Sequence, residues 1–382
     1  MSPLGRPDVR SDSTPARGVG YAELRSVTLG DVRAVFSPRC YQRSTSRALA
    51  GFLFDASLYA VALGGVFAFE NPLIRMAFGL LAGGAVALLF VWAHDAAHGA
   101  LFTSDVISEV LGTAAMLPSL QMYRLWTYGH NRVHHGFTSF SPIDWVWRPL
   151  TPAQYQARSR WGRAVYRLER HPATCGLHYL LHVWWAGMVR FQPAQPGRRI
   201  RYRWSKALTL TFAAAFGVAA YRFAGGWVGV ISAVVVPFLV FTYVIALVVY
   251  LHHTHPDVPF FTDRREWSPV IGPIVCSTAV RSNPLIEFLT HHILVHPPHH
   301  VDTRIPYYRL PQAHAELSAS YGGHICEYRL RWSAVRHIFS RCQLYDFVTH
   351  TWHRFAELSA TDGSPAPGPP SCSGEPAGAH TT

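Results

Sequence analysis

Thirteen of the 22 histidines stand in four short runs of the sequence. The first run holds His94 and His98, and the others lie at 130–135, 252–255 and 291–300. Residues four apart point the same way on a helix, so His94 and His98 can hold one metal ion between them. Neutral imidazole is the commonest metal ligand at pH 7. So many imidazoles, with no paired thiolates, favour iron, copper or zinc over magnesium or calcium.

Not every member of these runs can face one site. If the run at 252–255 is helical, its histidines point to different sides, and Pro256 ends any helix there. We therefore expect one or two of them to bind metal and the rest to orient the ligands through hydrogen bonds. The pair at 291–292 has the same ambiguity. Four aspartates are candidate hydrogen-bond partners or, equally well, solvated surface carboxylates: Asp95, Asp144, Asp257 and Asp302.

The composition indicates a membrane protein. The chain is 49% hydrophobic and 15% charged, against about 25% charged for a soluble protein. A net charge of +12 fits either nucleic acid or an anionic membrane face. The basic residues flank long apolar runs, which favours the membrane and excludes a nucleic-acid partner. The six cysteines show no Cys-x-x-Cys spacing, so we interpret them as reduced thiols.

Four apolar runs are long enough to cross the hydrocarbon core of a bilayer, which takes roughly 17 to 25 helical residues. Asp55 in the first is costly there unless it faces headgroups or another helix. Arginines crowd one side of the runs, so the positive-inside rule places both termini and every histidine run in the cytosol. The sequence predicts an all-α integral membrane protein with four transmembrane helices in two hairpins and a cytosolic helical cap holding the histidines. The predicted spans are residues 48–69, 73–93, 207–223 and 227–251.

The rest of the chain divides around these spans. Residues 1–20 are polar and predict a disordered N-terminus, and 21–47 predict a cytosolic helix and linker. Residues 48–355 form the expected membrane domain, within which 178–191 is aromatic and amphipathic, as in a helix lying at the membrane surface. Residues 356–382 are rich in Pro, Gly, Ser and Ala, which predicts a disordered tail.

These residues match a known family. The chain resembles the membrane fatty-acid desaturases, in particular the bacterial and cyanobacterial acyl-lipid omega-6/delta-12 type. The runs His94–His98, His130–His135 and His296–His300 are similar to the family's three histidine boxes, although the second is one residue longer than the shorter family form. Two further stretches look like that branch: His252–Pro259 and Val301–Tyr308, the second of which ends with Arg304–Tyr308.

The resemblance covers about residues 45–330 and implies an O2-dependent fatty acid desaturase. Its cofactor would be two iron ions (Fe2+/Fe3+), and O2 would be reduced to water as two hydrogens leave a membrane-lipid acyl chain, forming a cis double bond. The histidines would bind metal and would not act as general bases. By motif, the implied ligands are His94, His98, His130, His134, His135, His296, His299 and His300, with one more from His253 or His255.

The electrons must come from a separate protein. The sequence has no Gly-x-Gly-x-x-Gly unit for a nucleotide, no cysteine spacing for an iron–sulfur cluster and no His-Pro-Gly-Gly signature of a fused cytochrome b5-like domain. Arginines at 158–170 and 190–203 would attract an acidic carrier such as a ferredoxin. The expected location is a bacterial inner membrane.

Two other functions fit the same residues. One is a related membrane di-iron hydroxylase or ketolase acting on a carotenoid, alkane or sterol; the Thr-His-Pro and Arg-Ile-Pro segments argue against it. The other is a non-enzymatic histidine-rich metal transporter. Transport would require polar residues along the spans, and only Asp55 lies well within one.

Overall fold

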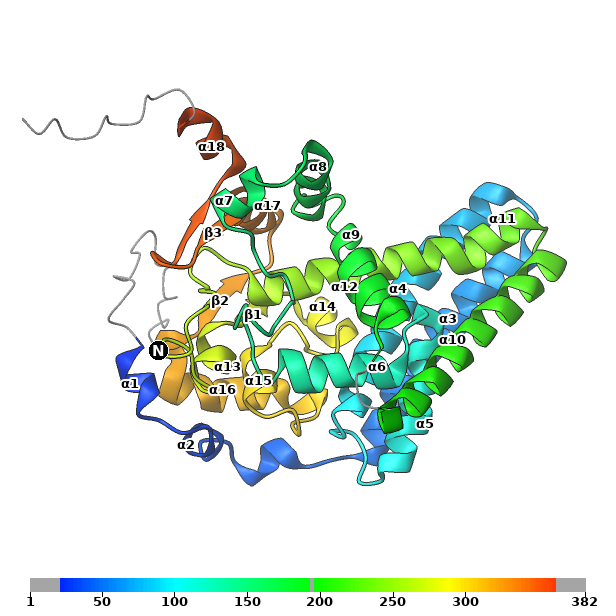
Figure 1. Cartoon of the computed structure of the whole chain (residues 1–382). Helices are drawn as coiled ribbons and strands as arrows, with labels where there is room; N and C mark the ends of the chain where they lie inside the picture. The colour runs from blue at the N-terminus through cyan, green and yellow to red at the C-terminus, as the bar shows by residue number, and fades with distance from the viewer. Residues whose placement is uncertain (1–20, 193–195, 362–382) are drawn as a thin grey trace, which may run out of the picture.

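The computed structural model describes residues 21–192 and 196–361, and it is mostly helical (Figure 1). The predicted disorder at 1–20 and at 362–382 lies outside the described residues. The chain remains helical beyond residue 355, where the sequence predicts that the tail begins, because α18 spans Phe355–Thr361.

Three helices in the described part of the chain are long and apolar enough to cross a membrane. They are α3 (Thr45–Ala68), α4 (Pro72–Ala97) and one continuous helix built from α11 (Trp227–Val230), η5 (Ile231–Val235) and α12 (Val236–His253). They correspond to the predicted spans at 48–69, 73–93 and 227–251. The turn between α3 and α4 is closed by Asn71, whose side chain accepts hydrogen bonds from the first turn of α4.

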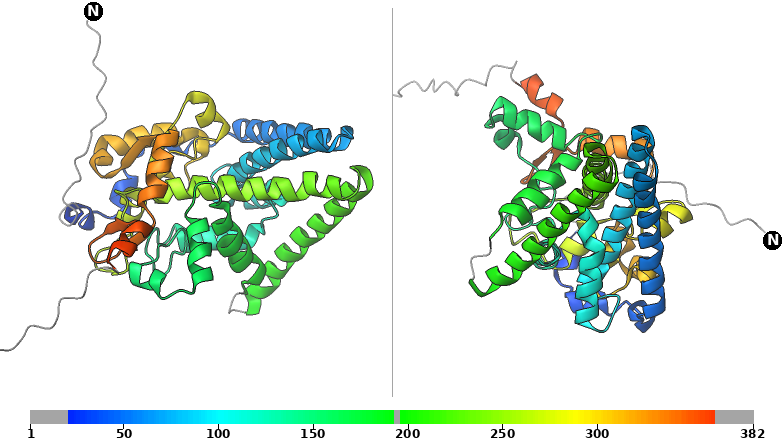
Figure 2. Two further views of the ribbon diagram at one scale, coloured as in Figure 1. Left: turned by 90° about the horizontal axis from the view of Figure 1, so that it is seen from above. Right: turned by 90° about the vertical axis from the view of Figure 1, so that its right-hand side faces the viewer.

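The predicted span at 207–223 lies within α10 (Pro196–Phe223), which is not one of these three helices. Its apolar stretch has Lys206 at one end and Arg222 at the other, and arginines fill the turns before it, which lowers its mean hydropathy. The structure thus confirms three candidate membrane helices. The fourth span and the two-hairpin arrangement are not confirmed. Even so, α10 lies beside α11 and η5 (Figures 1 and 2).

Two glycines let α4 approach the continuous helix closely. A Cβ atom at Gly79 would lie 2.4 Å from the carbonyl oxygen of Ser232, and one at Gly83 would lie 2.5 Å from Val240 Cβ. Small residues at such contacts allow helix backbones to pack tightly within a bilayer. This contact brings together the ends of α4 and α12, and both of these ends carry histidines.

The other elements are mostly short, and most of them gather around one end of the long helices (Figure 1). Before α10 they are α1 (Ala22–Arg25), α2 (Leu29–Arg33), η1 (Pro38–Tyr41), α5 (Asp105–Met116), η2 (Leu117–Ser119), α6 (Tyr123–Tyr128), η3 (Gly129–His134), α7 (Pro152–Gln156), α8 (Arg160–Glu169), α9 (Gly176–His178) and η4 (Tyr179–Arg190). After α12 they are α13 (Ile271–Val275), β1 (Thr278–Arg281), α14 (Pro284–Leu289), α15 (Pro297–Val301), η6 (Tyr307–Arg309), α16 (Leu310–Tyr321), η7 (Gly322–His324), β2 (Cys326–Arg329), α17 (Trp332–Arg341), β3 (Leu344–Asp346), β4 (Thr351–His353) and α18.

The described residues also form two small sheets, so the fold is mostly helical, whereas the sequence predicts an all-α fold. β1 pairs in parallel with β2, and β3 pairs antiparallel with β4. On its other side β1 contacts the segment that leads into α15, since Val280 N donates to Leu294 O at 2.9 Å. The short strand thereby holds the third histidine box in place, a role that its four residues do not reveal in the sequence.

Candidate metal centre

Nine histidines of the described chain form two groups, one partly buried and one fully buried, and within each group the ligand atoms lie within 4.8 Å of one another. The first group is His94, His98, His130, His135 and His299. The second group is His134, His253, His296 and His300. Four segments far apart in the sequence supply them, namely the end of α4, η3 with the residue after it, the end of α12, and α15 with the residue before it.

The second box divides between the groups because η3 is a π-helix, which has a wider turn than an α-helix. His135 N donates to His130 O, five residues earlier, at 3.0 Å. The wide turn brings the Nε2 atoms of His130 and His135 to 3.0 Å in the first group, while His134 points to the second group. The extra residue of the second box is thus accommodated by a local change of helix type.

The third box divides in the same way. α15 places His299 in the first group, while His296 and His300 face each other in the second, with their Nε2 atoms 2.9 Å apart. Both η3 and α15 therefore supply histidines to both groups. The ring of His135, in the first group, stacks on the ring of His300, in the second, with centroids 4.2 Å apart.

The structure separates the two histidines that the sequence left as alternatives. α12 ends at His253, whose Nε2 lies 3.1 Å from His134 Nε2. Thr254 is extended, which turns His255 away into a different cluster with Asp257 and Cys326. The structure thus does not bring His255 to either group. His252 is a further member of the run at 252–255, and its ring stacks on that of His296 with centroids 3.9 Å apart.

Hydrogen bonds fix the orientation of several rings. His94 Nδ1 donates to Asp95 (3.0 Å) and His134 Nδ1 to Asp144 (3.1 Å). The Nδ1 atoms of His253 and His300 donate to Cys276 O and Thr138 Oγ1, both at 3.0 Å. A proton on Nδ1 leaves the Nε2 lone pair free to bind metal.

Two of the four candidate aspartates, Asp95 and Asp144, contact ring nitrogens of the groups. Asp302 instead accepts hydrogen bonds from Arg304 and Tyr41, and Asp257 lies 3.4 Å from His255.

The arrangement of the rings fits metal ions. Several ring nitrogens are buried with no hydrogen-bond partner among the described residues: Nε2 of His98, Nδ1 of His135, Nδ1 of His296 and both nitrogens of His299. Buried polar atoms without partners are costly, whereas a bound metal ion would satisfy one nitrogen of each ring that coordinates it. Burial also lowers the pKa of His98, His130 and His299 well below its ordinary value, which keeps these rings in the neutral form that binds metal.

His291 lies outside both groups. Its Nε2 lies 2.6 Å from Asp55 Oδ2 in α3, and both side chains are buried. Asp55, the acid that the sequence places within the first span, therefore faces a partner from another element, as its burial requires. Tyr307, whose ring lies 4.5 Å from that of His291, donates its backbone N–H to Asp95.

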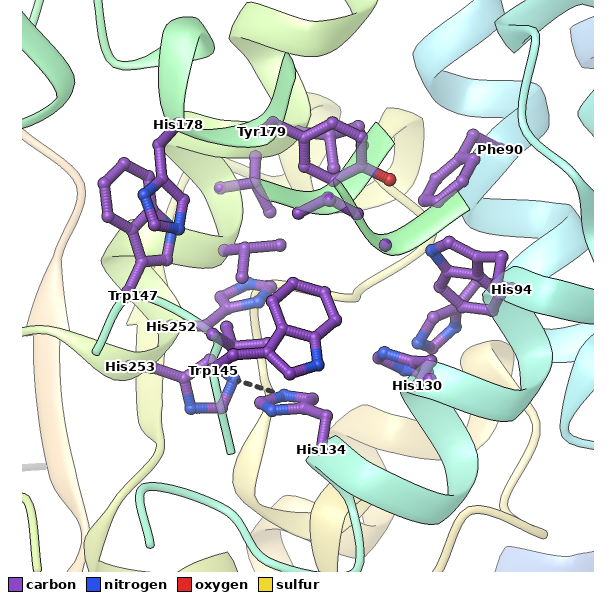
Figure 3. A pocket seen from close by; sticks show the side chains of 18 of the residues that line it. Phe90, His94, His130, His134, Trp145, Trp147, His178, Tyr179, His252 and His253 are labelled. Carbon is purple, nitrogen blue, oxygen red and sulfur yellow. Dashed lines mark hydrogen bonds between the residues drawn. The ribbon is translucent and has the colours of Figure 1, made fainter. Parts of the chain in front are cut away.

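An apolar cavity runs along both groups (Figure 3). Its walls come from α4, α6, η4 and α12, with Phe90, Trp126, Tyr179 and Ile245 among the apolar side chains. The histidines that line it are His94 and His130 of the first group, His134, His253 and His296 of the second, and also His178 and His252. A flexible hydrocarbon chain in this cavity would lie against both groups.

Comparison with known proteins agrees with this geometry. Residues 71–332 match the family model described as fatty acid desaturase. The chain is 29% identical to the sn-1 oleoyl-lipid 12-desaturase of Picosynechococcus over 72% of its own length and 78% of that protein. It is 27% identical to the chloroplastic omega-6 fatty acid desaturase of Glycine max, over 86% and 76% of the two chains. It is 29% identical to the sn-1 acyl-lipid omega-3 desaturase (ferredoxin) of Nostoc, over 75% and 79%. The chain therefore belongs to the fatty acid desaturase family and is an oxidoreductase.

Proposed function

We propose that this protein introduces a cis double bond into an acyl chain of a membrane lipid, with O2 as co-substrate and two iron ions as cofactor. The observation that carries the proposal is the apolar cavity bordered by both histidine groups. The relatives named as acyl-lipid desaturases support the substrate class. Per turnover, two hydrogens leave the chain, two electrons and two protons are added, and O2 becomes two molecules of water.

The nine grouped histidines are the proposed ligands. The first group would hold one iron ion and the second group the other, which omits His255 from the ten candidates of the sequence. When bound, iron supplies the reactivity with O2 that no side chain can provide. The chain's own residues do the positioning. Asp95, Asp144, Cys276 O and Thr138 hold four of the rings by Nδ1, so that their Nε2 atoms face the metal positions.

The walls of the cavity position the substrate. Side chains such as Phe90, Val183 and Ile245 offer only carbon atoms to an acyl chain and exclude water from the space beside the histidines. Such a cavity binds a hydrocarbon by the area that it buries, so the position of the chain is set by the length and bend of the cavity. The two adjacent carbons of the acyl chain that lie next to the histidine groups would each lose one hydrogen.

We also propose the membrane arrangement. The histidines of α4 and α12 lie at the ends of two candidate spans, and η4 connects to α10 at the same end of the bundle (Figure 2). With α10 as the fourth span, the chain from 48 to 355 forms two hairpins, and the short elements form a cytosolic cap with both termini on that side. The density of arginine before α10 supports this orientation.

The proposed electron donor is a separate acidic protein such as a ferredoxin, and two relatives are named as ferredoxin-type omega-3 desaturases. A surface hollow on α8 supports a docking site for it. Arg160, Arg163 and Arg167 line this hollow, with Tyr155 and Phe355 beside them. No carboxylate is among its described lining residues. Its charge would therefore be matched by acidic side chains of a partner.

The test is expression in a host without polyunsaturated lipids, followed by analysis of its fatty acids. The expected result is a new cis double bond that depends on O2, together with two iron ions per purified chain. A hydroxylated or keto product containing oxygen from 18O2 would show a sister oxidase instead. Metal flux across vesicles with no O2-dependent product would contradict enzymatic function.

A further inference from the structure

A third group of metal-ligand side chains lies outside both histidine groups. It consists of Glu169 at the end of α8, His178 in α9 and His182 in η4. Glu169 Oε1 lies 2.9 Å from His182 Nε2, and Oε2 lies 3.6 Å from His178 Nδ1. Ligand atoms bound tetrahedrally to zinc at about 2.0–2.2 Å lie roughly 3.4 Å from one another. The observed separations lie on either side of that value.

The carboxylate of Glu169 is buried, with 5% of its surface exposed. Within the described residues, no arginine or lysine nitrogen lies within 4.0 Å of it, and its ion-pair partners are the two imidazoles. The neighbouring Arg170 donates to the backbone oxygens of Trp147 (2.7 Å) and Cys342 (3.4 Å) instead. A metal ion bound between this carboxylate and the two imidazoles would place positive charge directly beside the buried anion.

The rings are also held and accessible. The His178 ring stacks on Trp147 with centroids 3.8 Å apart and an angle of 13° between the planes (Figure 3). The stack fixes the plane of the imidazole before any ligand arrives. The side chain of His182 is 45% exposed, which leaves a path from solvent and an open position for water. A rigid ligand set with one open side is typical of zinc sites that keep a water molecule.

We propose that Glu169, His178 and His182 bind one divalent transition metal ion, for which zinc fits best, and that this ion clamps α8 to η4. Two imidazoles and a carboxylate are nitrogen and oxygen ligands that zinc accepts readily. The clamp has a structural consequence, because Tyr179 and Val183 of η4 form part of the wall of the apolar cavity. The ion would hold that wall against α8.

The experiment measures metal in the full-length, iron-loaded protein. Protein in detergent is treated with zinc, freed of loosely bound metal by a brief chelator wash, and analysed for zinc and iron by mass spectrometry. The wild type is expected to retain one zinc ion per chain more than Glu169→Gln and His182→Asn, at equal iron content. His171→Asn is the matched control, since His171 is an exposed histidine in the turn after α8, and it should retain the zinc.

Two further measurements keep the test decisive. Zinc should raise the unfolding temperature of the wild type and leave that of His182→Asn unchanged. X-ray absorption at the zinc edge of the wild type should show two imidazoles with oxygen ligands. Equal zinc retention in the wild type and both variants would overturn the proposal. So would a zinc environment with three or more imidazoles, which would place the ion in the histidine groups.

Discussion

At the scale of single residues, the end of α12 separates two histidines that are two positions apart. His253 is buried with Nε2 3.1 Å from His134 Nε2, whereas His255 stacks on Tyr328 on the other side of an extended residue. Ring orientation at His253 is fixed by Cys276 O. One residue of extended backbone thus distinguishes a proposed ligand from a histidine of the surrounding structure.

This distinction predicts opposite outcomes for a matched pair of variants. His253→Ala removes one of four nitrogens from the second group, so we expect it to lose about one of two iron ions and to reduce desaturation at least 100-fold, in line with the sensitivity of metal sites to their ligands. His255→Ala should keep both ions and most of the activity. Metal analysis and fatty-acid analysis of both variants check this. Loss of iron in His255→Ala alone would reverse the assignment.

A second prediction concerns Asp55, which joins a membrane helix to the segment before the third box. Asp55→Ala leaves the buried Nε2 of His291 without its partner, which we expect to lower the free energy of unfolding by about 1–3 kcal/mol. Because His291 precedes α15 by few residues, iron content should fall as well. Thermal unfolding in detergent measures the first effect. Glu70→Ala, at an exposed acid beyond the end of α3, is the control and should change neither quantity.

At the scale of elements, the placement of the histidines depends on how closely α4 approaches η5 and α12. Two glycines of α4 have opposite environments: a Cβ at Gly79 would lie 2.4 Å from Ser232 O, while one at Gly84 would meet nothing within 4 Å. The η3 π-turn also positions histidines, since its wide turn places His130 and His135 in the first group and His134 in the second.

The glycine pair gives a prediction at this scale. Gly79→Ala should force α4 away from a backbone carbonyl, lowering the unfolding temperature and the iron content. Gly84→Ala should be neutral or stabilising by up to about 1 kcal/mol, because alanine favours the helix over glycine. Thermal unfolding of the two variants in the same detergent makes the comparison. If Gly79→Ala proves as stable as Gly84→Ala, the close contact is not required for the fold.

At the scale of the whole molecule, the charge of +12 has two interpretations, attraction to anionic lipids or docking of an acidic donor. In nanodiscs of neutral lipid only the second remains. The hollow lined by Arg160, Arg163 and Arg167 is the proposed docking site, and exposed charges are screened beyond about 8–10 Å near physiological ionic strength.

We therefore expect turnover with limiting ferredoxin in such nanodiscs to fall steeply as salt rises. Arg160→Glu with Arg163→Glu should raise the apparent Michaelis constant for the donor about tenfold and spare the iron content. Arg336→Glu with Arg341→Glu, an equal charge change at exposed positions of α17, is the control. A rate that is insensitive to salt, with unchanged donor affinity in the first variant, would exclude this hollow as the docking site.

The sequence by itself determined the family, the histidine boxes as candidate metal ligands and three apolar helices. Hydropathy and box spacing depend only on the order of residues in the sequence, so these features can be predicted without knowing which residues contact one another. The predicted fourth span is not confirmed, because Lys206 and Arg222 interrupt the apolar character of α10.

Only the tertiary structure decided which histidine belongs to which group. His94 meets His299, and His134 meets His253, across gaps in sequence of more than a hundred residues, and such pairings depend on packing that no local pattern encodes. The same holds for Asp55 with His291, and for Glu169 with His178 and His182, which had no box spacing to mark them. A ligand set is a property of the folded chain, because the atoms that share an ion are brought together by helix contacts, a π-turn and one short strand.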